Sequence, residues 1–435
     1  VTKTDMKWVR SDLGTGALQR EVTALRCGLD PSAWADPSKW SEKTDEDRQR
    51  KQAQQARREG CIKATGVTVS DDVLPPFDAA RAHKLYKGLF GEVEDMIRGK
   101  HLLVVPSGPL TQLPLQVLVT EPPSTDTALK DIAFLGARQP ITVLPSAASL
   151  KSLRGDAKPS RASEPFIGFG NPVLAGNPNC GKITIPDRCP NDPAPATEAA
   201  SRMLGRLVAS LNTVTAYFNR SGQADVESVR KLCPLPDSAH ELSCVAKSLG
   251  AGADSMVIGP AMTEPAVRRA KLERYRVLHF ATHGLLAGEM SAMAKGKAEP
   301  ALVFTPPKVA SDEDDGLLTA SEITTLKLDA DWVVMSACNT AAGGASGAEA
   351  LSGLAKAFFY AGARALLVSH WPVNSYAATM LTSTTFAELK RDPKIGRAEA
   401  FRRAMVSLIN DKDRPWAAHP SVWAPFVVVG EGGAG

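Results

Sequence analysis

A histidine and a cysteine each follow an apolar run that predicts a β-strand, and these two residue types together can perform nucleophilic catalysis. His283 follows the run Val277–Phe280, and Cys338 follows the run that begins at Trp332. A thiol with an ordinary pKa of about 8.5 is only slightly ionised at neutral pH, whereas an imidazole with a pKa of about 6.5 can accept its proton. A cysteine beside a histidine is therefore a competent nucleophile.

Attack on a peptide carbonyl also needs hydrogen-bond donors for the oxygen that becomes negative. The backbone N–H groups of Gly284 and Cys338 are the predicted donors, and a glycine at 284 leaves room for a substrate to approach. Four residues beside the strand ends are the predicted lining of a substrate pocket: Thr282, Ser336, His370 and Trp371. Ordinary packing explains Trp371 equally well.

Each residue of the pair also has a plain structural explanation when it is taken alone. A histidine at a strand end is commonly a satisfied structural residue, and a buried cysteine commonly behaves as a small hydrophobe. The catalytic interpretation therefore depends on the fold bringing His283 and Cys338 to the same edge of one sheet.

The elements that would position the pair are those of an α/β fold, because short apolar runs alternate with helical patterns from about residue 75 onward. Continuous apolar strands indicate burial on both faces, as in a mostly parallel sheet flanked by helices. The predicted strands are Leu102–Val105, Thr142–Leu144, Phe166–Phe169, Ser255–Ile258, Val277–Phe280, Trp332–Ala337, Ala365–Ser369 and Phe426–Val429. Reaction sites in such sheets lie beyond the carboxyl ends of the strands, where His283 and Cys338 fall.

The chain divides into a helical, charged N-terminal segment, residues 1–74, and an α/β domain, residues 75–435. In the first segment the polar run Ser41–Gly60 is typical of a solvated helix or loop. Two stretches of the second, Gly170–Thr197 and Ala287–Gly316, are predicted to interrupt the sheet as loops.

Charge and hydropathy exclude some partners. The 435 residues carry 51 basic and 47 acidic side chains, a formal net charge of +4, which gives no reason to expect nucleic acid or an anionic membrane as a partner. No apolar run approaches the roughly 20 residues that span a bilayer. Besides Cys338 there are six cysteines, which fit either three disulfides in an exported or envelope protein or reduced thiols in the cytoplasm.

Other motifs are weaker, and we expect no metal and no cofactor. Gly176 to Lys182 matches most of a phosphate-binding loop, but Ile183 replaces the hydroxyl that such loops need. No serine-hydrolase GxSxG sequence occurs. Five residues could in principle bind zinc, although none has the tight CxxC spacing of structural sites: Cys180, Cys189, Cys233, His240 and Cys244.

The surroundings of the pair resemble a known family. Thr282-His283-Gly284 and Ser336-Ala337-Cys338 resemble the signatures of caspase-like peptidases, with the histidine about fifty residues before the cysteine. The chain from about Phe77 to Gly430 is more closely similar to the CHAT family. The motifs that carry this likeness are Val105-Pro106-Ser107-Gly108-Pro109-Leu110, the segment from Leu235-Pro236 to Glu241, Ala348-Glu349-Ala350-Leu351, Tyr360-Ala361-Gly362-Ala363-Arg364, Ser369-His370-Trp371-Pro372-Val373, and Trp423-Ala424-Pro425-Phe426.

This resemblance implies a caspase-like three-layer sandwich and a cysteine endopeptidase in which Cys338 is the nucleophile and His283 the general base. The expected partner is a peptide or protein substrate. The alternative hypothesis is a catalytically silent scaffold for protein binding or signalling, because a fold alone does not establish a function. CHAT proteins are frequently joined to helical TPR repeats that present a substrate or regulator, so the expected partners are such a repeat region or a regulatory protein. No such repeats are seen in this sequence, and a repeat region before Val1 stays an open possibility. Caspases carry Ser where Thr282 stands and Arg-Gly where Asn339-Thr340 stands, so their preference for Asp before the cut does not transfer.

Overall fold

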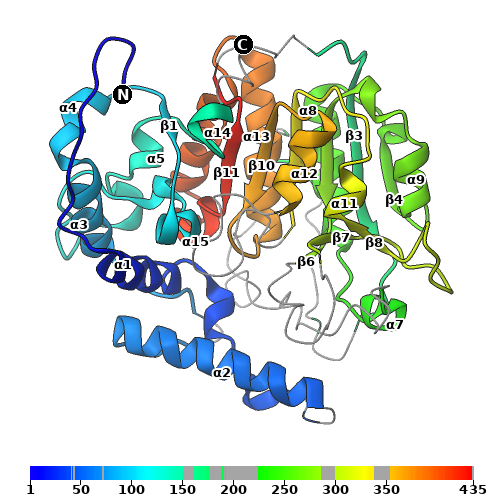
Figure 1. The fold of residues 1–435 in the computed structure, drawn as a ribbon, viewed down its shortest axis with the longest axis horizontal. Coiled ribbons are helices and arrows are strands. Elements are labelled where there is room, and N and C mark those ends of the chain that lie inside the picture. Colours follow the sequence, from blue (N-terminus) through cyan, green and yellow to red (C-terminus); the bar gives the residue numbers. More distant parts are fainter. Residues whose placement is uncertain are drawn as a thin grey trace.

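An eight-stranded sheet forms the centre of the computed structural model of this protein (Figure 1). The structure describes residues 1–40, 42, 45–70, 73–149, 160–176, 180, 188–190, 192, 224–285, 299–337 and 353–433. In spatial order the strands are β1 (Leu102–Val104), β2 (Ile141–Val143), β11 (Phe426–Gly430), β10 (Ala365–Ser369), β9 (Trp332–Met335), β5 (Tyr275–Ala281), β3 (Glu164–Pro172) and β4 (Met256–Gly259). Each of the eight strands predicted from apolar runs coincides with one of these.

Neighbouring strands of this sheet are parallel with one exception. The pair β10 and β11 is antiparallel, so β1, β2 and β11 run opposite to the other five strands. On the other side of that pair, β10, β9, β5, β3 and β4 are all parallel, and their carboxyl ends lie at one edge. The predicted mostly parallel α/β sheet is confirmed, and the edge where His283 and Cys338 were expected belongs to the five-stranded block.

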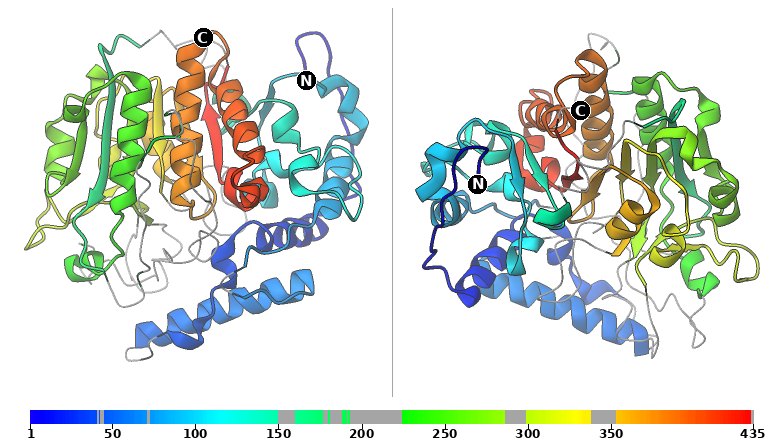
Figure 2. Two further views of the ribbon diagram at one scale, coloured as in Figure 1. Left: turned by 180° about the vertical axis from the view of Figure 1, so that it is seen from behind. Right: turned by 45° about the horizontal axis from the view of Figure 1, so that its top comes forward.

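Helices cover both faces of the sheet, which confirms the sandwich (Figures 1 and 2). The first face packs against α8 (Pro236–Leu249), α13 (Ser375–Arg391) and α14 (Arg397–Ile409). The second face packs against α9 (Glu264–Arg269), α11 (Ala320–Ile323) and α12 (Gly353–Ala361). Successive strand residues alternate between the faces, so Val277 lies in the first core and Leu278 in the second.

A small antiparallel sheet follows β5 along the chain. It consists of β6 (Gly284–Leu285), β7 (Ala301–Val303) and β8 (Leu317–Thr319). The prediction of Ala287–Gly316 as a loop is therefore wrong for β7, whose three apolar residues are fully buried between the other two strands. The other predicted loop, Gly170–Thr197, is wrong at its start, because β3 continues to Pro172 in parallel pairing with β4.

The N-terminal segment forms two helices, of which the first packs on the sandwich and the second packs against the first. Val22 and Leu25 of α1 (Thr15–Cys27) are buried in the same core as Leu85 of α3 (Ala79–Phe90). The charged run expected as a helix or loop is a helix, α2 (Asp45–Thr65), and a disulfide joins Cys27 to Cys61. The other α-helices of the described ranges are α4 (Glu94–Ile97), α5 (Leu135–Arg138), α7 (Val226–Arg230) and α15 (Pro420–Trp423). Within the described residues, every helix is too short or too polar to cross a membrane.

Candidate active site

His283 lies at the carboxyl end of β5, between the large and the small sheet. Its backbone oxygen accepts a hydrogen bond from the N–H of Val303 at 2.9 Å. The hydroxyl of the preceding residue, Thr282, donates to the backbone oxygen of Val303 at 2.7 Å. β7 thus fixes the backbone that carries the imidazole. His279 of β5 lies against Glu241 of α8, and the His283 ring, beyond the strand end, contacts the Cys233 carbonyl three residues before α8.

The imidazole of His283 is held by a backbone carbonyl. Nε2 lies 2.7 Å from the backbone oxygen of Cys233, and the residue is only 3% exposed. A carbonyl oxygen can only accept, so Nε2 carries the proton in this contact and Nδ1 is the basic nitrogen of the neutral ring. Burial lowers the pKa of His283 to about 4, against the opposing effect of the Cys233 hydrogen bond. The ring is therefore neutral, and able to accept a proton, at neutral pH.

Cys338 itself lies outside the described residues, but the strand that leads to it is described up to Ala337. Ser336 donates its N–H to the backbone oxygen of Phe280 at 2.9 Å, which continues the parallel pairing of β9 with β5. The backbone oxygen of Ala337 accepts a hydrogen bond from the Ser369 hydroxyl at the end of β10. The last described residue before Cys338 is thereby fixed at the sheet edge that carries His283.

Two of the predicted pocket residues lie beside His283, and both hydroxyls make hydrogen bonds. Thr282 is buried and bonded to β7, as described above. Ser336 donates its hydroxyl to Glu241 Oε2 on α8 at 3.1 Å. The predicted oxyanion donor Gly284 begins β6 and pairs with Leu302.

The other two predicted pocket residues, His370 and Trp371, follow β10 and face the N-terminal helices. Trp371 is fully buried, and its Nε1 donates to the backbone oxygen of Ser421 at 2.9 Å. The guanidinium of Arg26 on α1 lies 5.3 Å from the Trp371 ring centre and donates to the backbone oxygen of His370 at 3.0 Å. Trp371 is thus packed against α1 and α15. Thr282 and Gly284 flank His283 along the chain, and Ser336 directly follows the strand paired with β5.

Two carboxylates on α8, those of Asp237 and Glu241, lie near this edge of the sheet. The sequence analysis did not predict them as site residues. Glu241 contacts Ser336 through Oε2, and its Oε1 lies 3.0 Å from His279 Nε2. Asp237, one helical turn earlier, accepts a hydrogen bond from the hydroxyl of Ser375 on α13. Both belong to the Leu235-Pro236 to Glu241 motif, which was the only signal in the sequence that could have found them.

All six cysteines other than Cys338 form disulfides. The pairs are Cys27–Cys61, Cys180–Cys233 and Cys189–Cys244. Of the two states that the sequence left open, the structure has the oxidised one. His240 Nε2 lies 3.5 Å from Cys244 Sγ, but that sulfur and Cys189 Sγ are bonded to each other, so this group lacks the thiolates that a zinc site requires.

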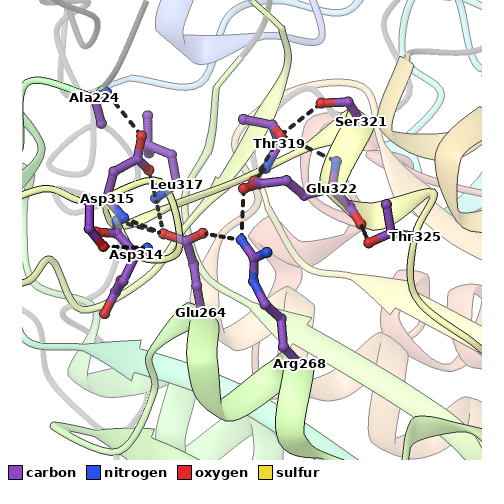
Figure 3. A network of polar contacts seen from close by, with 12 residues as sticks. Ala224, Glu264, Arg268, Asp314, Asp315, Leu317, Thr319, Ser321, Glu322 and Thr325 are labelled. Atoms are coloured by element: carbon purple, nitrogen blue, oxygen red, sulfur yellow. Dashed lines mark hydrogen bonds and ion pairs between the residues drawn. The ribbon is translucent and has the colours of Figure 1, made fainter.

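A buried carboxylate on α9 holds the start of β8 in the small sheet (Figure 3). Glu264 of α9 is 1% exposed, and its Oε1 accepts backbone N–H groups from Asp315, Gly316 and Leu317 at 2.7–3.1 Å. Its Oε2 pairs with Arg268 at 3.2 Å. Burial raises the pKa of Glu264 to about 8. These contacts fix the start of β8, which pairs with β7, the strand that holds the Thr282 and His283 backbone.

Comparison with known proteins supports the family suggested by the motifs. The profile of the CHAT domain matches residues 79–431, most of the chain and all of the described sheet. The chain belongs to the CHAT domain family. Its match begins at the first residue of α3, so α1 and α2 precede the part that the family profile covers.

Curated relatives of this CHAT domain include Tetratricopeptide repeat protein 28 from Mus musculus and from Homo sapiens. Each is 28% identical over 222 residues, which is 45% of this chain. The matched part makes up 9% of the mouse protein and 8% of the human protein, so the chain spans less than a tenth of the length of these relatives.

Two solved structures are also similar to this CHAT domain at low identity. One is the Arg specific cysteine proteinase gingipain R, with a TM-score of 0.40 and 10% identity over 85% of this chain and 71% of that chain. The other is the Saccharomyces cerevisiae separase in complex with securin, with a TM-score of 0.40 and 10% identity over 98% of this chain and 22% of that chain.

Proposed function

We propose that this CHAT domain is a cysteine endopeptidase in which His283 is the general base and Cys338 the nucleophile. One observation carries the proposal: the His283 ring is anchored through Nε2 to the Cys233 carbonyl, at the sheet edge where β9 ends, three residues before Cys338. A histidine whose Nε2 proton is committed in this way presents Nδ1 as the base.

The reaction begins with transfer of the Cys338 thiol proton to His283 Nδ1. The sulfur attacks the peptide carbonyl carbon, and the carbonyl oxygen takes the negative charge, with the Gly284 and Cys338 backbone N–H groups as donors. The carbon–nitrogen bond then breaks, the amine leaves with the proton from His283, and a thioester remains. Water gives a proton to His283 and attacks the thioester, which releases the carboxylic acid and restores the thiol.

Thr282 and Ser336 have supporting roles in this proposal. The Thr282 hydroxyl ties the residue before the base to β7, and the Ser336 hydroxyl ties the strand of the nucleophile to α8. Both bonds restrict movement of the segments that must hold an imidazole and a thiol within reach of each other, which is what proximity catalysis requires.

The test is cleavage of a mixed peptide library by the purified protein, followed by mass spectrometry. The parent protein is expected to cut, and both Cys338→Ala and His283→Ala to cut at least about 10³-fold more slowly. Variants that cut as fast as the parent would contradict the mechanism. Absence of any cut, together with failure of an acyloxymethyl-ketone thiol probe to label Cys338, would instead support the silent scaffold.

A further inference from the structure

Asp237 lies between two residues that contact the proposed site, one bonded to the His283 ring and one bonded to Ser336 on the strand that leads to Cys338. It is the second residue of α8, which starts at the sheet edge that carries His283. Four residues before it, the Cys233 carbonyl holds the His283 ring; four residues after it, Glu241 holds Ser336. Since a helix rises about 1.5 Å per residue, Asp237 and Glu241 are about 6 Å apart along the axis of α8.

The carboxylate of Asp237 is buried and only half satisfied. The residue is 8% exposed, and its Oδ2 accepts the hydrogen bond from Ser375. Its Oδ1 has no hydrogen-bond partner within the described chain. Burial raises the pKa of Asp237, as does the neighbouring Glu241, while the Ser375 hydrogen bond and the N–H groups of Asp237 and Ser238 at the helix start lower it. Most buried carboxylates are fully hydrogen-bonded, so this oxygen needs an explanation.

A cation would satisfy that oxygen, but the described part of the protein supplies none there. Within the described chain, no Lys or Arg forms an ion pair with Asp237 or with Glu241, whose close contact is His279. An uncompensated buried charge destabilises a protein by several kcal/mol in general, so a carboxylate of this kind is commonly completed by a ligand. The ligand that fits one open carboxylate oxygen beside a serine hydroxyl is an ammonium or guanidinium group.

We propose that Asp237 receives the side chain of a basic residue, Arg or Lys, immediately before the scissile bond. This specificity rests on the proposed peptidase function. The side chain before the cut is carried on the carbon next to the attacked carbonyl, and Asp237 lies on the α8 segment that contacts both the base and the nucleophile strand. A long, flexible, positively charged side chain can reach a recessed carboxylate from there and replace the missing partner of Oδ1.

Product binding tests the inference without requiring turnover. Peptides that end in Arg or in its neutral isostere citrulline, with mixed residues before them, are titrated calorimetrically into Cys338→Ala protein. We expect Arg peptides to bind about 10- to 100-fold more tightly than citrulline peptides. The preference is expected to vanish when Asp237→Asn or Asp237→Ser is added, and to persist with Asp413→Asn, which removes one exposed charge elsewhere.

The outcomes separate this inference from the proposed function. Equal binding of Arg and citrulline peptides to Cys338→Ala protein, or an Arg preference that survives both Asp237 substitutions in protein with parent-like thermal unfolding, would overturn the basic pocket. An Asp237-dependent Arg preference in a parent protein that cleaves no library peptide would support the pocket and contradict the peptidase. Cuts found chiefly after neutral or acidic residues would overturn the pocket and support the peptidase.

Discussion

At the scale of single residues, the sequence predicted the sheet edge that carries the proposed reacting groups, but not the groups that surround them. His283 and the residue before Cys338 lie at the edge where strand ends and residue types predicted them. The Cys233 carbonyl could not be predicted, because any residue supplies a carbonyl. Asp237 lies in a motif that the sequence did show, but its orphan oxygen exists only once the fold has excluded water from it. The contacts of Trp371 with Arg26 and Ser421 join segments far apart in the chain, so the sequence alone did not predict them.

Burial of His283 predicts the acid limb of the pH–rate profile. Since burial lowers its pKa from 6.5 to about 4, the neutral base persists well below the ordinary titration range of histidine. We expect kcat/KM for a library-derived peptide to stay level on acidification until about pH 5, and then to fall. A profile that already declines through pH 6.5 would show that the ring has an ordinary pKa and is not buried in this way.

At the scale of elements, the apolar runs predicted all eight strands of the large sheet, because each run is long enough to be recognised by itself. They did not predict the strand order, which depends on contacts between distant segments, or the small sheet. β6 has only two residues. β7 is as long as β1 and β2, but it lies in a stretch whose acidic run Asp312-Glu313-Asp314-Asp315 predicts a loop, and both become strands only through pairing. That small sheet nevertheless fixes the backbone of the proposed base.

The disulfide at Cys233 is expected to position His283, whereas its neighbour is not. Cys180–Cys233 and Cys189–Cys244 close similar sequence separations of 53 and 55 residues, so their loss is expected to lower stability similarly, by about 2–5 kcal/mol. Only the first holds the residue whose carbonyl accepts from His283 Nε2. Replacing both members of each pair by serine should therefore lower kcat about 10-fold or more for the first pair alone.

Steady-state kinetics of the two double variants, at a temperature where unfolding curves show both to be folded, checks this difference. Equal loss of kcat in the two would mean that the disulfides act only through stability.

Glu264 gives a stability test of the small sheet. Glu264→Ala removes the acceptor for three backbone N–H groups and is expected to destabilise the protein by about 3 kcal/mol or more. The pKa of Glu264 is raised from 4.5 to about 8, so its contribution to stability is full below pH 4.5 and is lost as the pH rises through 8.

Glu264→Gln, which keeps a neutral acceptor, should remove that part of the pH dependence, a slope of at most about 1.4 kcal/mol per pH unit. Urea unfolding of parent and variant between pH 5 and pH 9 measures it. Parallel stability curves for the two proteins would contradict the raised pKa.

At the scale of the whole molecule, three of the buried histidines are expected to lower the stability of the fold at acidic pH. Burial lowers the pKa of His283 and of His419 to about 4, and that of His370 to about 3. The unfolded chain therefore binds more protons at these histidines, so their contribution to stability is complete above pH 6.5 and falls as the pH drops toward 4. The free energy of urea unfolding at pH 7, 6 and 5 should decline steeply.

His419→Asn supplies the matched variant for this decline. The His419 side chain accepts the N–H of Ser421 at the start of α15, a role that asparagine performs well without titrating. The variant is expected to lose less stability between pH 7 and pH 5 than the parent. An unchanged slope would mean that His419 does not titrate as a buried group.

The three disulfides also bear on where the molecule functions. Disulfides persist in oxidising compartments, which favours the exported of the two locations that the sequence left open. They pair six of the seven cysteines of the sequence with one another. Mass spectrometry of the unreduced protein should find these six in three cross-linked peptide pairs.

The central claim is that His283 activates the Cys338 thiol, and the rate of Cys338 alkylation tests it most directly. Iodoacetamide labelling at pH 7, followed by intact-protein mass spectrometry, measures that rate in the parent, in His283→Ala and in His240→Ala as a control histidine. We predict one label per chain, a rate at least about 10-fold lower in His283→Ala, and a parent-like rate in His240→Ala. Equal rates in all three proteins would contradict the claim.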